Sequence, residues 1–195
     1  MRALALFLGV AALGGAVILM ASGVVGNAWK RVSGRLHAGD HVPDVRAQDQ
    51  DGHEVELAAL RGHIVALYFY PKDQTPGCTQ EALGFREAYA RIRQAGAEVV
   101  GVSNDDADSH KRFCVKKGLP FPLLADPEKA VARAFGVRSL FGFYERITFL
   151  IDGQGVIRKV FDPVKPAHHA DEVLAAIAEL RGAAAGTTTT TASVP

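Results

Sequence analysis

The sequence predicts an α/β sandwich in which helices flank a central mixed sheet. Two observations carry this prediction: strand-like and helix-like segments alternate along the middle of the chain, and the last strands form a hairpin before a final helix. With 195 residues, 48% of them hydrophobic and 22% charged, the chain suits one globular domain with modest extensions. The formal net charge of +1 and the lack of a basic stripe with interleaved aromatics argue against nucleic-acid binding.

The individual elements follow from the periodicity of the apolar residues. Alternating or continuous runs of β-branched and aromatic residues predict strands over 45–48, 54–57, 64–70, 98–103, 123–124, 146–151 and 156–161. Apolar residues at helical spacing predict helices over 79–95, 106–117, 128–135 and 168–180. Asp51-Gly52 is a good turn between the first two strands, and the continuous run 64–70 is typical of a strand buried on both faces.

The two ends of the chain are predicted to lie outside the folded domain. Residues 3–29 carry no charge, and such a run is long enough to cross a bilayer, which takes roughly 20 residues. We therefore expect residues 1–30 to form a membrane anchor, with a removed signal segment as the alternative. Residues 182–195 contain an alanine run and five consecutive threonines, and we expect a disordered tail there.

The expected anchor implies a localisation, although its orientation is harder to derive. A bacterial inner membrane is the expected site, with the domain on the exported, periplasmic side. Lys30, Arg31 and Arg35 follow the apolar run and would by themselves favour the cytoplasmic side.

Cys78 is the strongest candidate for a reactive residue. Isolated cysteines are more often small buried apolar residues, but Cys78 follows a buried strand and lies in the first turn of a predicted helix. Free N–H groups and the positive end of the helix dipole stabilise a thiolate there. Thr75 can bring its hydroxyl to the sulfur, and Pro71 can shield the site from solvent. These residues predict a reactive thiol without specifying its reaction.

The pattern Pro71-x-x-x-Thr75-x-x-Cys78 resembles the active-site signature of peroxiredoxins. The longer string YPKDQTPGCTQEA is similar to that of the Q-type branch, also called bacterioferritin comigratory proteins. The resemblance continues through segments in matching order, namely AGDHVPDV, GVSNDDADSHKRF, GLPFPLLAD and RITFLID. It covers residues 38–181, which is everything except the two ends.

The resemblance implies a thioredoxin-like fold and the reduction of hydrogen peroxide and organic hydroperoxides, with no cofactor and no metal. By position, Cys78 is the peroxidatic cysteine, Thr75 hydrogen-bonds the sulfur and the bound peroxide, and Pro71 shields the site. Arg146 is the guanidinium that stabilises the thiolate. An arginine stays charged and offers several donors, which suits both the thiolate and the oxygen that leaves.

Cys114 is the expected resolving cysteine, which would form a disulfide with the oxidised Cys78. Many relatives carry this residue five positions after the first cysteine, where this chain has Leu83. Another subset carries it in the later helix, and Cys114 fits that subset. The implied partner is thioredoxin or a similar dithiol reductant, and we expect a monomer. The alternative reading of Cys114 is a structural cysteine on the buried side of its helix.

Two other functions would also suit a thioredoxin-like fold. A membrane-tethered thiol–disulfide oxidoreductase needs a C-x-x-C motif, and the first position of that motif is Thr75 here. A copper-delivery protein needs two closely spaced cysteines and a histidine. His168 and His169 could serve as metal ligands, but only Cys78 lies near the predicted site.

Overall fold

The computed structural model describes residues 34–187, with the side chains of residues 34–183. Its helices are α1 (Pro76–Gln94), α2 (Ala107–Lys117), α3 (Ala130–Phe135), α4 (His169–Thr187) and the short 3-10 helix η2 (Leu57–Leu60). Its strands are β1 (Arg46–Gln48), β2 (Glu54–Glu56), β3 (Ile64–Phe69), β4 (Ala97–Ser103), β5 (Leu123–Ala125), β6 (Ser139–Leu140), β7 (Phe143–Tyr144), β8 (Ile147–Ile151) and β9 (Ile157–Phe161).

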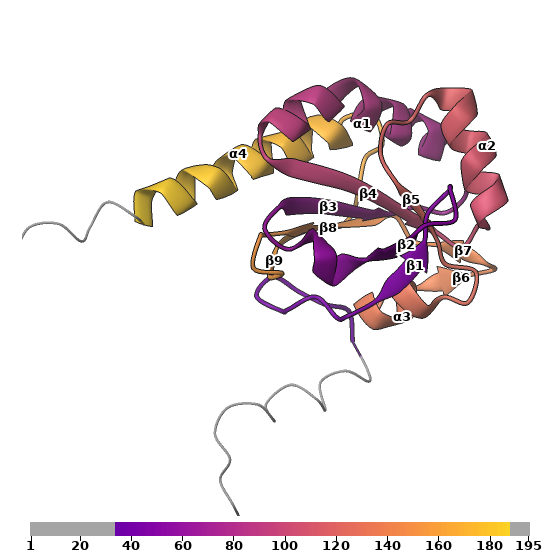
Figure 1. Cartoon of the computed structure of the whole chain (residues 1–195), viewed down its shortest axis with the longest axis horizontal. Coiled ribbons are helices and arrows are strands. Elements are labelled where there is room, and N and C mark those ends of the chain that lie inside the picture. The colour runs from indigo at the N-terminus through magenta and orange to yellow at the C-terminus, as the bar shows by residue number, and fades with distance from the viewer. Residues whose placement is uncertain (1–33, 188–195) are drawn as a thin grey trace, which may run out of the picture. The chain divides into compact units, whose positions relative to one another are not determined.

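Seven of these strands form one mixed sheet in the order β2-β1-β5-β4-β3-β8-β9. The central pairs β3–β4 and β4–β5 are parallel, whereas β3–β8 and β8–β9 are antiparallel. Helices α1, α2 and α4 cover one face of the sheet, and α3 lies on the other (Figure 1). The predicted mixed sheet flanked by helices is therefore confirmed.

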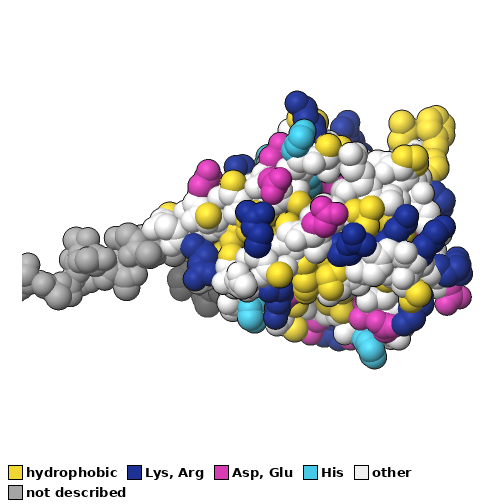
Figure 2. All heavy atoms as spheres, turned by 90° about the horizontal axis from the view of Figure 1, so that it is seen from above, with side chains coloured by type: hydrophobic (Ala, Val, Ile, Leu, Met, Phe, Trp, Pro, Cys, Tyr) yellow, Lys and Arg dark blue, Asp and Glu magenta, His cyan; other side chains and the backbone are white. Residues whose placement is uncertain are grey.

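Strand β3 shows why the sheet needs cover on both faces. Successive side chains of a strand point to opposite faces, so Ala66 and Tyr68 join the core under α1, α2 and α4, whereas Leu67 and Phe69 join the core beside α3. All four side chains are buried. Seen from above, the helix-covered face presents charged side chains of both signs among apolar ones (Figure 2).

Apart from shifts of one or two residues at element ends, the structure differs from the predicted elements in three respects. Helix α1 begins at Pro76, three residues before the predicted start, because proline suits the first position of a helix and Thr75 takes the preceding cap position. The hairpin β6–β7 and helix η2 were not predicted, since segments of two to four residues show no periodicity. Helix α4 continues to Thr187 instead of ending near 180, as alanine favours the helix strongly.

The predicted boundaries of the two ends fall largely outside the described part of the chain. The proposed anchor or signal segment, residues 1–30, lies outside it entirely, and so do residues 188–195 of the expected tail. Within residues 34–187, no helix is both long and apolar enough to cross a bilayer.

Candidate active site

Cys78 lies at the start of α1, just after the loop that follows β3. The chain leaves β3 at Phe69, crosses a loop with Gln74 in a left-handed conformation (φ 59°), and enters α1 behind the cap residue Thr75. Cys78 is therefore in the first turn of the helix, where backbone N–H groups have no helical partner and the dipole favours a negative charge. Its side chain is 1% exposed and carries a free thiol. The predicted placement at a helix amino terminus is confirmed.

Arg146 contacts the sulfur of Cys78, although the two residues are 68 positions apart in the sequence. It precedes β8, and its Nη2 donates a hydrogen bond to Cys78 Sγ at 3.2 Å. Its Nη1 donates to the carboxylate of Glu81, one turn further along α1. Burial alone would lower the pKa of Arg146, but Glu81 and Cys78 raise it, so the guanidinium stays charged. The structure thus places a fixed cation on the sulfur.

Behind Arg146 lies a buried group of polar side chains, of which the sequence analysis considered only His169, as a possible metal ligand. Glu81 is 1% exposed and uses one oxygen for Arg146, while its Oε1 has no hydrogen-bond partner within the described residues. That oxygen lies 3.9 Å from Nε2 of His169, the first residue of α4. The same nitrogen is 2.8 Å from Oγ1 of Thr148, on β8. Arg146 is therefore held by Glu81 of α1, and His169 of α4 lies beside Glu81.

The protonation of Glu81 makes the stability of the fold depend on pH. Burial raises the pKa of Glu81 to about 7, against the opposing effect of Arg146. Between its ordinary value of 4.5 and about 7, the folded protein binds a proton that the unfolded chain has released. The contribution of Glu81 to stability is therefore complete below the ordinary value and is lost as the pH rises through about 7.

Replacing Glu81 with glutamine should remove this loss, because the amide does not titrate. We expect the free energy of unfolding to fall less between mildly acidic and mildly alkaline pH in Glu81→Gln than in the wild type, as measured by urea denaturation. His169, whose pKa burial and Arg146 lower to about 4, contributes an opposite slope that both proteins share. Equal pH slopes in the two proteins would contradict the assignment.

Thr75 and Pro71 lie in the loop that precedes Cys78. The hydroxyl of Thr75 donates to the carbonyl oxygen of Lys72 at 3.0 Å. Its single hydrogen is thereby used, and its lone pairs remain available to accept a hydrogen bond. Pro71 is partly buried at the end of β3 and offers no N–H of its own.

A buried network ties this loop to α2. Asp73 accepts hydrogen bonds from the hydroxyls of Tyr70 (2.7 Å) and Ser109 (2.8 Å), and its Oδ2 lies 2.9 Å from Nδ1 of His110. The other ring nitrogen of His110 lies 3.1 Å from the carbonyl oxygen of Leu124. The first half of α2 is therefore fixed to the active-site loop.

Cys114 follows one turn after His110 on α2. Its thiol is free and 7% exposed, and it belongs to the same apolar core as Cys78. Burial and nearby aspartates raise its pKa to about 12, so the thiol stays protonated in this conformation. The two helices are neighbours, since Arg86 of α1 donates to the carbonyl oxygen of Lys117 at the end of α2 (2.7 Å).

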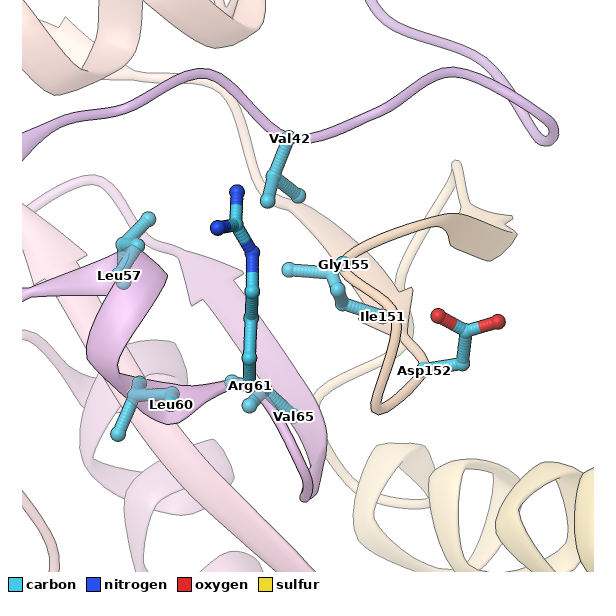
Figure 3. Close-up of a pocket in the computed structure, with 8 residues that line it drawn as sticks. All are labelled: Val42, Leu57, Leu60, Arg61, Val65, Ile151, Asp152 and Gly155. Carbon is cyan, nitrogen blue, oxygen red and sulfur yellow. The ribbon is translucent and has the colours of Figure 1, made fainter.

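Two further features lie away from this site. A pocket lined by Leu57, Val65 and Ile151 lies at the amino end of β3, the end opposite the active-site loop (Figure 3). Asp49, Asp51 and His53 form an acidic group in the β1–β2 turn, but Asp49 already accepts from the backbone N–H groups of the other two. Neither feature contacts Cys78 or Arg146.

Comparison with known proteins places this geometry in a family. The AhpC/TSA family matches residues 38–160. Peroxiredoxin Q, chloroplastic, of Triticum aestivum is 43% identical over 152 residues, covering 76% of this chain and 70% of that protein. The protein of the same name from Sedum lineare is 41% identical, covering 75% of this chain and 81% of that one.

Solved structures agree with these relatives. The crystal structure of peroxidoxin BcpB from Mycobacterium tuberculosis matches with a TM-score of 0.71 and 35% identity, covering 75% of this chain and 99% of that one. A structure of Xanthomonas campestris peroxiredoxin Q matches with a TM-score of 0.68 and 40% identity, covering 73% of this chain and 97% of that one.

The comparisons also correct the expected localisation. The relatives from Triticum aestivum and Sedum lineare are named as chloroplastic proteins, which contradicts the expectation of a bacterial inner-membrane protein. The transmembrane helix is likewise unsupported within the described residues. The expectation rested on hydropathy alone, and its segment, residues 3–29, is not among those residues.

The family match includes Cys78, Cys114 and Arg146, because it runs from Ala38 into β9. The expected thioredoxin-like sandwich is confirmed by the solved structures, and a copper carrier or a C-x-x-C oxidoreductase is no longer needed to explain the reactive thiol. The chain belongs to the AhpC/TSA family and is a thiol peroxidase of the peroxiredoxin Q group.

Proposed function

We propose that Cys78 is the peroxidatic cysteine of this enzyme, and the observation that carries the proposal is the hydrogen bond from Arg146 Nη2 to Cys78 Sγ at 3.2 Å. The Cys78 thiolate attacks the terminal oxygen of the peroxide and the O–O bond breaks. The sulfur takes up the OH group as a sulfenic acid, and the other oxygen leaves as an alkoxide or hydroxide, which takes a proton to become an alcohol or water. The substrates are hydrogen peroxide and organic hydroperoxides.

Arg146 and Thr75 have complementary roles in this step. The guanidinium stabilises the thiolate before the attack and the developing negative charge on the leaving oxygen during it. The hydroxyl of Thr75, whose hydrogen is committed to Lys72, accepts a hydrogen bond from the OH of the peroxide and so orients it. Pro71 limits the access of water.

Removing the guanidinium of Arg146 should destabilise the thiolate of Cys78. A hydrogen bond to a charged group contributes about 1.5–3 kcal/mol, so Arg146→Ala should slow the alkylation of Cys78 at neutral pH by about tenfold or more. Peroxide attack at neutral pH should slow by at least about tenfold. Arg146→Lys keeps the charge but not the forked donor pair, so its rate of peroxide attack should lie between those of the wild type and Arg146→Ala.

A control is needed because Arg146→Ala also leaves the buried carboxylate of Glu81 without its partner. The double variant Arg146→Ala/Glu81→Gln removes that charge, and it should recover stability without recovering the rate of peroxide attack. An unchanged alkylation rate in both variants would remove Arg146 from the site.

We propose further that Cys114 resolves the sulfenic acid. Its thiol attacks Cys78 Sγ, water leaves, and an intramolecular disulfide forms. A supporting observation is that Xanthomonas campestris peroxiredoxin Q has been solved as two cysteine-to-serine mutants at positions 36 residues apart, the spacing of Cys78 and Cys114. A dithiol reductant such as thioredoxin then returns both cysteines to thiols.

We infer that α2 loosens when Cys114 resolves the sulfenic acid. A disulfide needs Cα atoms within roughly 7 Å, and the two thiols are buried on separate helices. The first half of α2 is anchored through Ser109 and His110 to Asp73. The second half ends at Gly118, in a left-handed conformation (φ 60°), and is the part that we propose unwinds, with loss of the hydrogen bond from Arg86 to Lys117. Exposure also removes the burial that holds the pKa of Cys114 at about 12.

We propose a monomeric enzyme whose peroxidase domain spans residues 38–181. All residues proposed for the site lie within that range. Deleting residues 1–30 should leave the peroxidase activity intact. Sedimentation of the deleted protein in its dithiol and disulfide forms would measure its oligomeric state.

A further inference from the structure

The outward side of α2 is strongly basic. Lys111, Arg112, Lys116 and Lys117 lie within three residues of Cys114, and no acidic residue occurs between Asp108 and Asp126. We call these four residues with the exposed Val115 the basic face of α2; the side chain of Val115 is 72% exposed. The chain as a whole carries only +1, so this is a local concentration of charge. Lys and Arg side chains gather toward this end of the helix-covered face (Figure 2).

Most of this charge is unpaired. Lys111 forms an ion pair with Asp51 of the β1–β2 turn. Among the residues that the structure describes, Arg112, Lys116 and Lys117 make no ion pair. Long cationic side chains around a single exposed valine form a surface that suits an acidic partner with a small apolar contact at its centre.

The chemistry of the Cys78–Cys114 disulfide, which is part of the proposed function, selects the sulfur that a reductant attacks. Exchange is faster when the thiolate that leaves is the more stable one. Attack on Cys114 Sγ releases Cys78, whose thiolate receives the hydrogen bond from Arg146. Attack on Cys78 Sγ would instead release Cys114, which lacks such a cation at hydrogen-bonding distance within the described residues. The favoured target therefore lies on α2.

The basic residues next to Cys114 in the sequence stay near it even when α2 unwinds. Because Arg112 and Lys116 are two residues from Cys114 along the chain, their Cα atoms stay within roughly 7 Å of the Cα atom of Cys114 in any backbone conformation. A partner that binds these charged side chains can therefore bind the disulfide form as well as the folded dithiol form.

We propose that the basic face of α2 is the docking surface for a protein dithiol reductant that carries acidic side chains beside its reactive thiol, and that this thiol attacks Cys114. The reductant thiolate bonds to Cys114 Sγ while the S–S bond breaks and Cys78 leaves as a thiolate. The second thiol of the reductant then attacks the mixed disulfide. It releases Cys114 as a thiol, and the reductant is oxidised to its own disulfide.

The first test locates the mixed disulfide. The peroxide-treated protein is first checked by peptide mapping for the Cys78–Cys114 disulfide. It is then mixed with a thioredoxin whose second active-site cysteine is replaced by serine, which traps the intermediate. The thioredoxin should be found on the peptide that contains Cys114. Trapping on Cys78 would overturn the inference while leaving the disulfide established, whereas absence of the disulfide would overturn the resolving step and this inference with it.

The second test concerns the charges. Arg112→Glu/Lys116→Glu should lower kcat/KM for reduction of the disulfide by thioredoxin about tenfold and reverse its salt dependence. Reduction by dithiothreitol, a small uncharged dithiol, should be unchanged, which also shows that the variant folds. The matched control Arg61→Glu/Lys159→Glu alters the net charge equally, away from α2. An equal loss in the control, or no loss in the α2 variant, would contradict the docking surface.

Discussion

Replacing Cys78 with serine should abolish peroxide consumption. An alcohol is not appreciably ionised at neutral pH even beside Arg146, so the variant lacks the nucleophile that breaks the O–O bond. Loss of a catalytic nucleophile costs several orders of magnitude in rate, and we expect a decrease of about 10³-fold or more. The measurement is the disappearance of hydrogen peroxide in the presence of a dithiol reductant.

Two controls separate chemistry from folding in this experiment. Serine is close in size to cysteine and keeps the first turn of α1, so Cys78→Ser should unfold at nearly the same denaturant concentration as the wild type. Leu83→Ala, on the same helix but outside the proposed site, should keep its peroxidase activity. Turnover close to the wild-type rate in Cys78→Ser would refute the assignment of Cys78.

Replacing Cys114 with serine should separate the two halves of the cycle. Cys78, Arg146 and Glu81 remain in place, so the variant should still react once with peroxide at the wild-type rate, as seen in single-turnover measurements. Turnover with thioredoxin should fall by at least about tenfold, a barrier increase of about 1.4 kcal/mol. With no resolving thiol, Cys78 should also over-oxidise to the sulfinic acid more readily.

Hydrogen exchange tests the motion that this step requires. Amides around Phe113 and Cys114 should exchange faster in the disulfide form of the wild type than in its dithiol form, because the second half of α2 must loosen. The first turn of α2, where Asp106 caps the N–H of Ser109, should change less. Normal turnover of Cys114→Ser, together with no internal disulfide in the wild type, would make Cys114 structural.

The order of the elements was predictable because strong periodicity marks the long ones. The run 64–70 and the helical spacing after Thr75 identified β3 and α1, and with them the position of Cys78. Arg146 was different. It lies 68 residues from Cys78, and only the resemblance to peroxiredoxins connected the two, since nothing local marks a residue before a strand as part of a distant site.

Glu81 and His169 show what the residue pattern alone could and could not reveal. Glu81 lies three residues after Cys78 and interrupts the buried stripe of Ala82 and Phe85, so an acidic residue on that side of α1 was a usable indication of a buried partner. His169 gave no comparable indication. Its position depends on α4 packing against α1 after the whole sheet has formed, and this contact spans more than 80 residues.

The most direct test of the central claim is mass spectrometry of the protein after one equivalent of hydrogen peroxide, with and without a dithiol. The account predicts that the oxidised protein loses two hydrogen atoms, that peptide mapping joins Cys78 to Cys114, and that the dithiol restores both thiols. In Cys114→Ser, the same treatment should add one oxygen atom at Cys78. An unmodified Cys78 in the wild type, under conditions in which peroxide is consumed, would contradict the account.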